Sequence, residues 1–188
     1  MHMKEMLFTP GWNETDFQYA ASFKTPYRRP FVQAEGCIEN DLSEQDYISM
    51  VTKETLGAGS VIETECSFEG SGAPLIVLCD DLKTLPDGSL QYGTHMEVVL
   101  YKNGCNVWHI VVNEGVQKAS ALIKCRYPVA AGERHKLRVE FGEKMLKVHC
   151  AGVEFDLPCP LLPEKFHAGL TACEGICRFY SLKIGTSK

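Results

Sequence analysis

The chain has 188 residues, of which 45% are apolar and 23% are charged, and its formal net charge is −5. This length and composition are typical of one globular domain with a hydrophobic core. The acidic balance and the scattered lysines and arginines argue against nucleic acid as the main partner. No run of about 18 apolar residues occurs, so we expect no membrane span.

The sequence starts with MHMKEMLFTPGW, which lacks an apolar segment long enough for a secretory signal, so we expect a cytoplasmic location. The number of cysteines is nine, no CxxC occurs, and most of them lie in apolar strand-like runs. This pattern favours buried free thiols in a reducing compartment. Only Cys173 and Cys177, spaced CxxxC, suggest a metal site or a disulfide as an alternative.

Residues 1–30 have the weakest pattern, and we expect them to form an arm that closes a groove or contacts another subunit. A single helical turn could lie at 39–46. From there on, short strand-like runs alternate with turn residues, at 47–53, 61–70, 74–80, 92–101, 104–112, 119–129, 135–141, 145–150, 153–157, 168–173 and 177–185. Tight turns at Asn103-Gly104 and Ala151-Gly152 indicate antiparallel hairpins. The sequence predicts a single all-β domain over residues 1–188, an antiparallel β-sandwich.

The C-terminal third resembles the concanavalin A-like lectin/glucanase jelly rolls. The residues that carry the resemblance are Gly132, Glu133, His135, Leu137, Val139, Val148, Gly152, Gly169, Leu170, Arg178, Phe179, Leu182 and Ile184. Arg134 and Ser181 stand where that pattern usually has Trp and Asn. The segment THMEVVLYKNGCNVWHI, residues 94–110, is similar to the 3-keto-glycoside hydrolase-like branch. The resemblance implies a jelly roll whose curved outer face holds sugar, and it leaves the activity open.

The segment from Tyr92 to Val112 predicts a hairpin with Asn103-Gly104 at its turn. In this register, Tyr101 pairs with Asn106 and Val99 pairs with Trp108, which makes Glu97 and Trp108 diagonal neighbours. One face of the hairpin is then apolar and holds Met96, Val98, Leu100, Val107, His109 and Val111. The other face is mixed and holds His95, Glu97, Val99, Tyr101, Asn106, Trp108, Ile110 and Val112.

The mixed face suits a partly enclosed groove better than open solvent or a sealed core, because an unpaired buried charge is costly. An aromatic ring covers the C–H face of a sugar, while carboxylate, amide and imidazole groups bind its hydroxyls. We therefore predict Tyr101, Asn106 and Trp108 as sugar-binding residues, with Glu97 as acid/base and His95 as its partner. The following strand adds Lys124 and Arg126, which could pair with Glu97 or bind an anionic or oxidised sugar.

Each of these residues also has a simpler explanation. Glu97 could only form a cross-strand ion pair with Lys124 or Arg126, the loop 80–91 could cover Trp108, and His95 could be a surface residue. We expect His109, on the apolar face, to be a histidine satisfied within the core.

Other acidic groups are weaker candidates. Glu154 and Asp156 resemble the start of a glucanase three-carboxylate motif but lack its continuation, and we expect them on an outer strand. Glu63 and Glu65 are expected at a solvated edge. Asp80-Asp81, or the His95–Glu97 pair, could hold Ca²⁺ or Mn²⁺, although no cofactor is implied with certainty.

Three functions therefore stay open: an enzyme acting on a small glycoside as a hydrolase or lyase, a non-catalytic sugar-binding or accessory subunit of a larger enzyme, and a β-sandwich that binds only protein. A homo-oligomer or a partner enzyme subunit is compatible with each of them.

Overall fold

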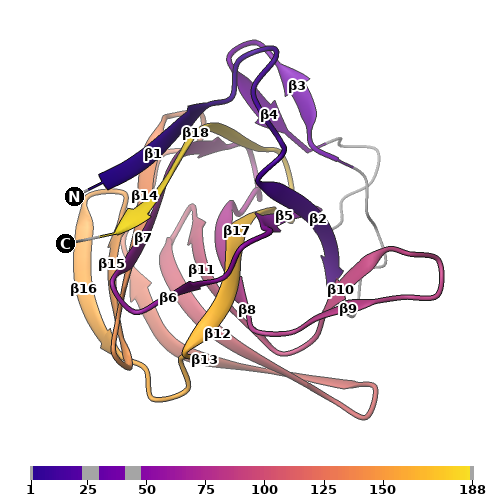
Figure 1. The fold of residues 1–188 in the computed structure, drawn as a ribbon. Helices are drawn as coiled ribbons and strands as arrows, with labels where there is room; N and C mark the ends of the chain where they lie inside the picture. Colours follow the sequence, from indigo (N-terminus) through magenta and orange to yellow (C-terminus); the bar gives the residue numbers. More distant parts are fainter. Residues whose placement is uncertain (1, 23–29, 41–47, 187–188) are drawn as a thin grey trace.

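A computed structural model describes residues 2–22, 30–40 and 48–186 as strands and connecting turns, with no helix among them. The strands form two sheets packed face to face (Figure 1). Sheet A has the order β16-β15-β14-β7-β18-β4-β3, with β1 also paired to β18. Sheet B has the order β13-β12-β11-β8-β17-β5-β2-β10-β9, with β6 also paired to β17. The predicted all-β sandwich is confirmed, and no helix in the described part of the chain could span a membrane.

The strands of sheet A are β1 (His2–Leu7), β3 (Val32–Ala34), β4 (Cys37–Glu39), β7 (Ser60–Phe68), β14 (His135–Gly142), β15 (Met145–Cys150), β16 (Val153–Pro158) and β18 (Cys177–Thr186). Those of sheet B are β2 (Phe17–Ser22), β5 (Ile48–Thr52), β6 (Leu56–Gly57), β8 (Leu75–Cys79), β9 (Leu82–Thr84), β10 (Leu90–Tyr92), β11 (His95–Tyr101), β12 (Gly104–Asn113), β13 (Val116–Arg126) and β17 (Lys165–Ala172).

The main core lies between the sheets because alternate residues of each strand point inward. In β14, Leu137, Val139 and Phe141 are buried, while the residues between them are partly exposed. Strand β8 is buried on both faces: Ile76 joins the main core, whereas Leu75 and Val77 belong to a second apolar cluster on the outer face of sheet B. Sheet B therefore carries apolar surface outside the sandwich as well as inside it.

Segments expected to be an arm or a loop form strands within the two sheets. β1 pairs with β18, and β2 lies between β5 and β10, running parallel to β10. The 80–91 segment contains the β9–β10 hairpin, which projects at the right of Figure 1. The helical turn suggested at 39–46 falls largely outside the described residues.

The β11–β12 turn differs from the sequence expectation. Its two central residues are Lys102 and Asn103, because Tyr101 pairs with Gly104. The carbonyl of Cys125 lies 2.0 Å from where a Cβ on Gly104 would be, so only glycine fits at this close approach, and its φ is +132°. The Ala151-Gly152 turn is as predicted, with positive φ at both residues.

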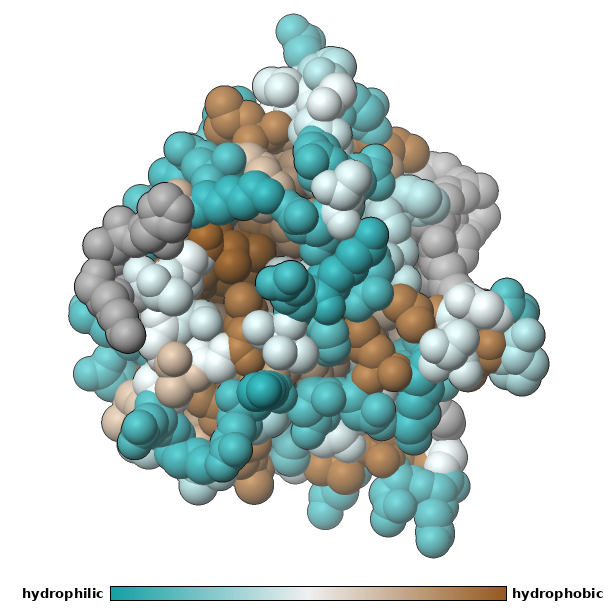
Figure 2. Space-filling model, in the orientation of Figure 1, coloured by the Kyte–Doolittle hydropathy of each residue, from teal (hydrophilic) through white to brown (hydrophobic). Residues whose placement is uncertain are grey.

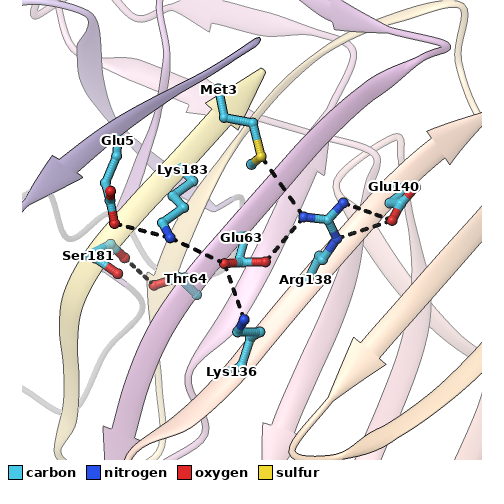
Figure 3. A network of polar contacts seen from close by, with 9 residues as sticks. All are labelled: Met3, Glu5, Glu63, Thr64, Lys136, Arg138, Glu140, Ser181 and Lys183. Carbon is cyan, nitrogen blue, oxygen red and sulfur yellow. Dashed lines mark hydrogen bonds and ion pairs between the residues drawn. The ribbon is translucent and has the colours of Figure 1, made fainter. Parts of the chain in front are cut away.

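The outer face of sheet A carries an ion-pair network centred on Glu63 (Figure 3). The Glu63 carboxylate lies 3.2 Å from Arg138, 3.6 Å from Lys136 and 3.8 Å from Lys183. The expectation of a solvated edge is wrong for Glu63, because β7 lies between β14 and β18 and the residue is only 8% exposed. Period two puts its side chain on the outer face, where neighbouring strands supply cations.

Two other sequence predictions are confirmed. β16, which carries Glu154 and Asp156, is the outer strand of sheet A. All nine cysteines are free thiols, and only Cys125 is not fully buried. Much of the visible surface in the view of Figure 2 is hydrophilic, with apolar surface recessed between the sheets.

Candidate functional site

The outer face of sheet B holds a groove of about 600 Å³, which we call the sheet B groove. Strands β8, β11, β12 and β13 form its floor, and the 71–73 and 173–174 segments and Ser22 complete its walls. Five residues predicted for the site line this groove, and they are His95, Glu97, Tyr101, Asn106 and Trp108. The structure thus brings these five side chains together around one space.

The observed register explains why they meet. Glu97 pairs directly with Trp108, Val99 with Asn106 and His95 with Ile110, and directly opposed residues share a face of the sheet. The expected diagonal relation between Glu97 and Trp108 is wrong, because the register differs by two positions. A shift of two leaves every side chain on its original face, whereas a shift of one would reverse them all.

His95 and Glu97 form a buried pair on the groove floor. Nε2 of His95 lies 3.2 Å from Oε1 of Glu97, and the two residues are 4% and 7% exposed. The expectation of a surface histidine is therefore wrong, and so is that of an ion pair from Glu97 to Lys124 or Arg126. The ring of Tyr92 packs edge-on against the imidazole, with the two ring centroids 4.8 Å apart, and fixes its orientation.

The hydrogen bonds of His95 determine what this pair can hold. Nδ1 lies 2.7 Å from the carbonyl oxygen of Gly93, which can only accept, so Nδ1 carries a hydrogen. The contact between Nε2 and Glu97 then needs one more hydrogen between the two atoms. The pair is either an imidazolium with a carboxylate or a neutral imidazole with a carboxylic acid. In both forms it stores one transferable proton facing the groove.

Trp108 is half-buried and lines the groove, so the 80–91 segment does not seal it as ordinary core. The ammonium of Lys124 lies 5.0 Å from the centre of its ring, within cation–π range. Lys124 pairs with Asn106 and Arg126 pairs with Gly104, so both project from the groove side of β13. Both are exposed, and neither is among the residues that line the groove: Lys124 lies beside it, next to Asn106 and Trp108, and Arg126 lies two residues further along the strand.

Two amide oxygens of the groove lack a hydrogen-bond partner among the described residues, Oδ1 of Asn106 and Oε1 of Gln117. Buried acceptors are normally satisfied, so two unsatisfied ones on the same groove suit a ligand that brings O–H or N–H donors. Asn106 was predicted for the site, whereas Gln117 was not. A β-bulge in β13 leaves Leu122 unpaired, so Gln117 and Lys124 share a face despite their odd separation.

Behind the groove, the side chains of Tyr92, Ser49 and Thr171 form a buried chain of hydrogen bonds. The Ser49 hydroxyl lies 2.8 Å from the hydroxyls of both other residues. Burial raises the pKa of Tyr92 far above its ordinary value, since no water is available to solvate the phenolate. These uncharged hydrogen-bonded side chains connect β10 to β5 and β17, and they hold in place the Tyr92 ring against which His95 packs.

His109 differs from the expected core histidine, because it is partly exposed. Burial lowers its pKa and the charge of His95 lowers it further, while Asp80 acts in the opposite direction. No three His, Cys, Asp or Glu side chains of the described ranges come together as metal ligands. Because both nitrogens of His95 already have partners, the His95–Glu97 pair is a poor fit for Ca²⁺ or Mn²⁺.

No protein-family model matches the sequence, and no curated protein does either. Solved structures match across nearly the whole chain. Carbohydrate-binding module CBM66 from Bacillus subtilis aligns with a TM-score of 0.63 at 10% identity, covering 89% of this chain and 94% of that one. The exoplasmic/lumenal domain of VIP36, solved with Ca²⁺ and Man3GlcNAc, aligns with a TM-score of 0.64 at 14% identity, covering 100% and 91%.

Rv0315, a pseudo β-1,3-glucanase of Mycobacterium tuberculosis, aligns with a TM-score of 0.56 at 13% identity, covering 98% of each chain. At these identities the likeness concerns the fold. The chain has the concanavalin A-like jelly-roll fold that the C-terminal motifs predicted.

Proposed function

We propose that this protein binds a small saccharide in the sheet B groove and acts on it as a hydrolase or lyase, with Glu97 as acid/base. The observation that carries the proposal is the buried Glu97 carboxylate, which is 3.2 Å from His95 and directly opposite Trp108 in the groove floor. A carboxyl group that shares a proton with an imidazole can give that proton to a leaving oxygen or take one from the substrate.

The other groove residues suit a sugar. The indole of Trp108 offers an apolar face for the C–H side of a ring, and the free amide oxygens of Asn106 and Gln117 can accept hydrogen bonds from its hydroxyls. Carbohydrate binding is also named for CBM66, which has the same fold. The buried free thiols are typical of a reducing compartment and support a cytoplasmic location.

One observation favours a non-catalytic sugar-binding module instead. Glycoside hydrolysis usually needs two carboxyl groups flanking the scissile bond. Among the described residues, the carboxylates that line the groove are Glu97 on the floor and Glu174 on the β17–β18 turn. A binding module, or a lyase that needs one acid/base group, accounts for this composition without a second buried carboxylate.

Turnover and binding measured together separate these functions. The protein is incubated with ordinary and 3-oxidised glucosides, with and without Mn²⁺ or Ca²⁺, and binding is followed by calorimetry. Glu97→Gln should abolish product formation and keep saccharide binding, because the amide can donate to Nε2 of His95 but has no proton to transfer. Glu154→Gln on β16 is the matched control and should retain full activity.

Binding without turnover in the unmodified protein would support the non-catalytic module. Turnover that persists in Glu97→Gln would remove Glu97 from the mechanism. A protein that binds no saccharide in a broad glycan panel would end the proposal and leave protein partners as the remaining function.

A further inference from the structure

We infer that the ligand of the sheet B groove is an anionic saccharide, whose acidic group is received by Lys124 and Arg126. This inference rests on the proposed saccharide function and narrows it to a substrate class. It comes from a cluster of cations at one end of the groove that form no ion pair with any residue that the structure describes.

Three cations gather around the β11–β12 turn. Lys102 lies in the turn and lines the groove, while Lys124 and Arg126 occupy the groove side of the adjacent strand β13. Within residues 2–22, 30–40 and 48–186, none of the three forms an ion pair. The net charge of the whole chain is −5, whereas the charge at this end of the groove is positive.

The outer face of sheet A provides the contrast. There the exposed or half-exposed cations Lys136, Arg138 and Lys183 all lie within 4 Å of Glu63 (Figure 3). Glu63 thus neutralises these three cations on sheet A. The three cations at the groove have no such carboxylate among the described residues and are available to a ligand. Such a partner must carry a negative charge of its own.

The acidic groups of the groove cannot serve as that partner. Glu97 is already paired with His95, and it lies two strand positions away from the row that holds Asn106 and Lys124. Glu174 lines the groove from the β17–β18 turn, and none of the ion pairs among the described residues includes it. A ligand carboxylate at the rim would therefore meet uncompensated positive charge.

The spacing of the groups suits one sugar unit. Two residues along a strand span about 7 Å, which is the separation of the Glu97–Trp108 row from the Asn106–Lys124 row. A sugar ring lying against Trp108 can present hydroxyls to Asn106 and approach Glu97, while its acidic substituent reaches Lys124. Arg126 lies two positions further along and adds a planar donor fork that suits a carboxylate or sulfate group.

Lys124 also contacts the aromatic ring of Trp108. Its ammonium lies over the Trp108 indole with no ion pair of its own among the described residues, so it is held at the rim before a ligand arrives. With an anionic sugar bound there, the Trp108 ring, the Lys124 ammonium and the Glu97 carboxylate would all contact the same ligand. A neutral saccharide could accept hydrogen bonds from Lys124 and Arg126 but would leave their positive charges without a counter-charge.

The test compares acidic sugars with neutral partners of the same shape. Uronic acid disaccharides, their methyl esters and a sulfated disaccharide are titrated by calorimetry against the full chain at low and physiological salt. The acid form, or the sulfated form, should bind at least about tenfold more tightly than the ester, and added salt should reduce this preference. The two anions distinguish a carboxylate from a sulfate source.

The double variant Lys124→Gln/Arg126→Gln should lose the preference for acid over ester while still binding the ester. Lys118→Gln is the matched control: Lys118 is on the same strand but pairs with Val111, which puts it on the opposite face, so the preference should be unchanged. Equal binding of acid and ester, or a preference that survives the double variant, would overturn the inference and leave the saccharide function standing. Failure of every saccharide, acidic or neutral, would overturn both.

Discussion

Nε2 of His95 and Oε1 of Glu97 lie 3.2 Å apart on the groove floor, and the carbonyl of Gly93 accepts a hydrogen bond from the opposite ring nitrogen. The histidine therefore cannot turn to another partner without breaking one of these two contacts. Glu97 is held in turn by a ring whose orientation is fixed from behind by Tyr92.

This relationship predicts different effects for two substitutions of Glu97. Glu97→Ala leaves a buried imidazole nitrogen without its partner and should lower the free energy of unfolding by about 1–3 kcal/mol. Glu97→Gln can donate from its amide to Nε2 and should lower it by less than half of that amount. Urea denaturation of the two variants measures both values, and equal losses would show that the hydrogen bond does not stabilise the fold.

The network around Glu63 predicts a larger effect on the far sheet. Glu63→Ala removes the acceptor shared by Arg138, Lys136 and Lys183, and it should cost about 3 kcal/mol of unfolding free energy because the site is largely buried. Glu154→Ala is the control, since Glu154 pairs with Lys147 at an exposed edge, and it should leave stability unchanged within error. A Glu63→Ala protein as stable as this control would contradict the role of the network.

The thiols predict a simple reactivity pattern. Eight of the nine cysteines are buried and only Cys125 has intermediate exposure. Under native conditions a thiol reagent such as DTNB should therefore modify at most one group, and Cys125→Ala should abolish that fast reaction. Denaturant should release all nine thiols. Rapid modification of several thiols in the native protein would contradict the packing of the core.

Burial of Cys79 predicts a loss of stability at alkaline pH. Its pKa is raised to about 12, chiefly by burial and to a smaller extent by Asp80 and Asp81. The unfolded thiol loses its proton near pH 8.5, so above that pH the unfolded state binds fewer protons than the native state. The unfolding free energy should then fall as pH rises towards 12, by up to about 1.4 kcal/mol per pH unit for this one group.

Cys79→Ala tests this linkage. The variant should be less stable than the parent at pH 7.5, where the thiol only contributes packing, but its stability should fall less steeply between pH 9 and 11. Urea denaturation in the presence of a reductant gives both slopes. Parallel slopes in the two proteins would show that Cys79 does not titrate on unfolding.

Much of the sandwich follows from local chemistry. Alternation in residues 145–150 and positive φ at Ala151 and Gly152 determine the β15–β16 hairpin without reference to the rest of the chain. The faces of β11 and β12 were also predicted correctly, because the error in register was an even number of residues. The error itself arose from Gly104, which lies outside the turn and where the carbonyl of Cys125 leaves no room for a side chain.

What the sequence could not reveal depends on pairing between distant segments. Alternation back from Lys124 would put Lys118 in the groove and Gln117 outside it, and only the bulge at Leu122 reverses this. The burial of Glu63 follows from the two strands that flank β7, which no local pattern encodes. Ser22 reaches the groove wall only because β2 pairs with β10, some 70 residues further along the chain.

Strands β17 and β18, the last two along the described chain, each complete a different sheet. β17 joins β8 to β5 in sheet B, and β18 joins β7 to β4 in sheet A. During synthesis, β8, β5, β7 and β4 therefore each have one edge without a partner strand until residues 165–186 have left the ribosome. Folding of these two sheets is expected to be slow and to follow the synthesis of β18, and shortening the chain before residue 165 would leave fragments prone to aggregate rather than a smaller working domain.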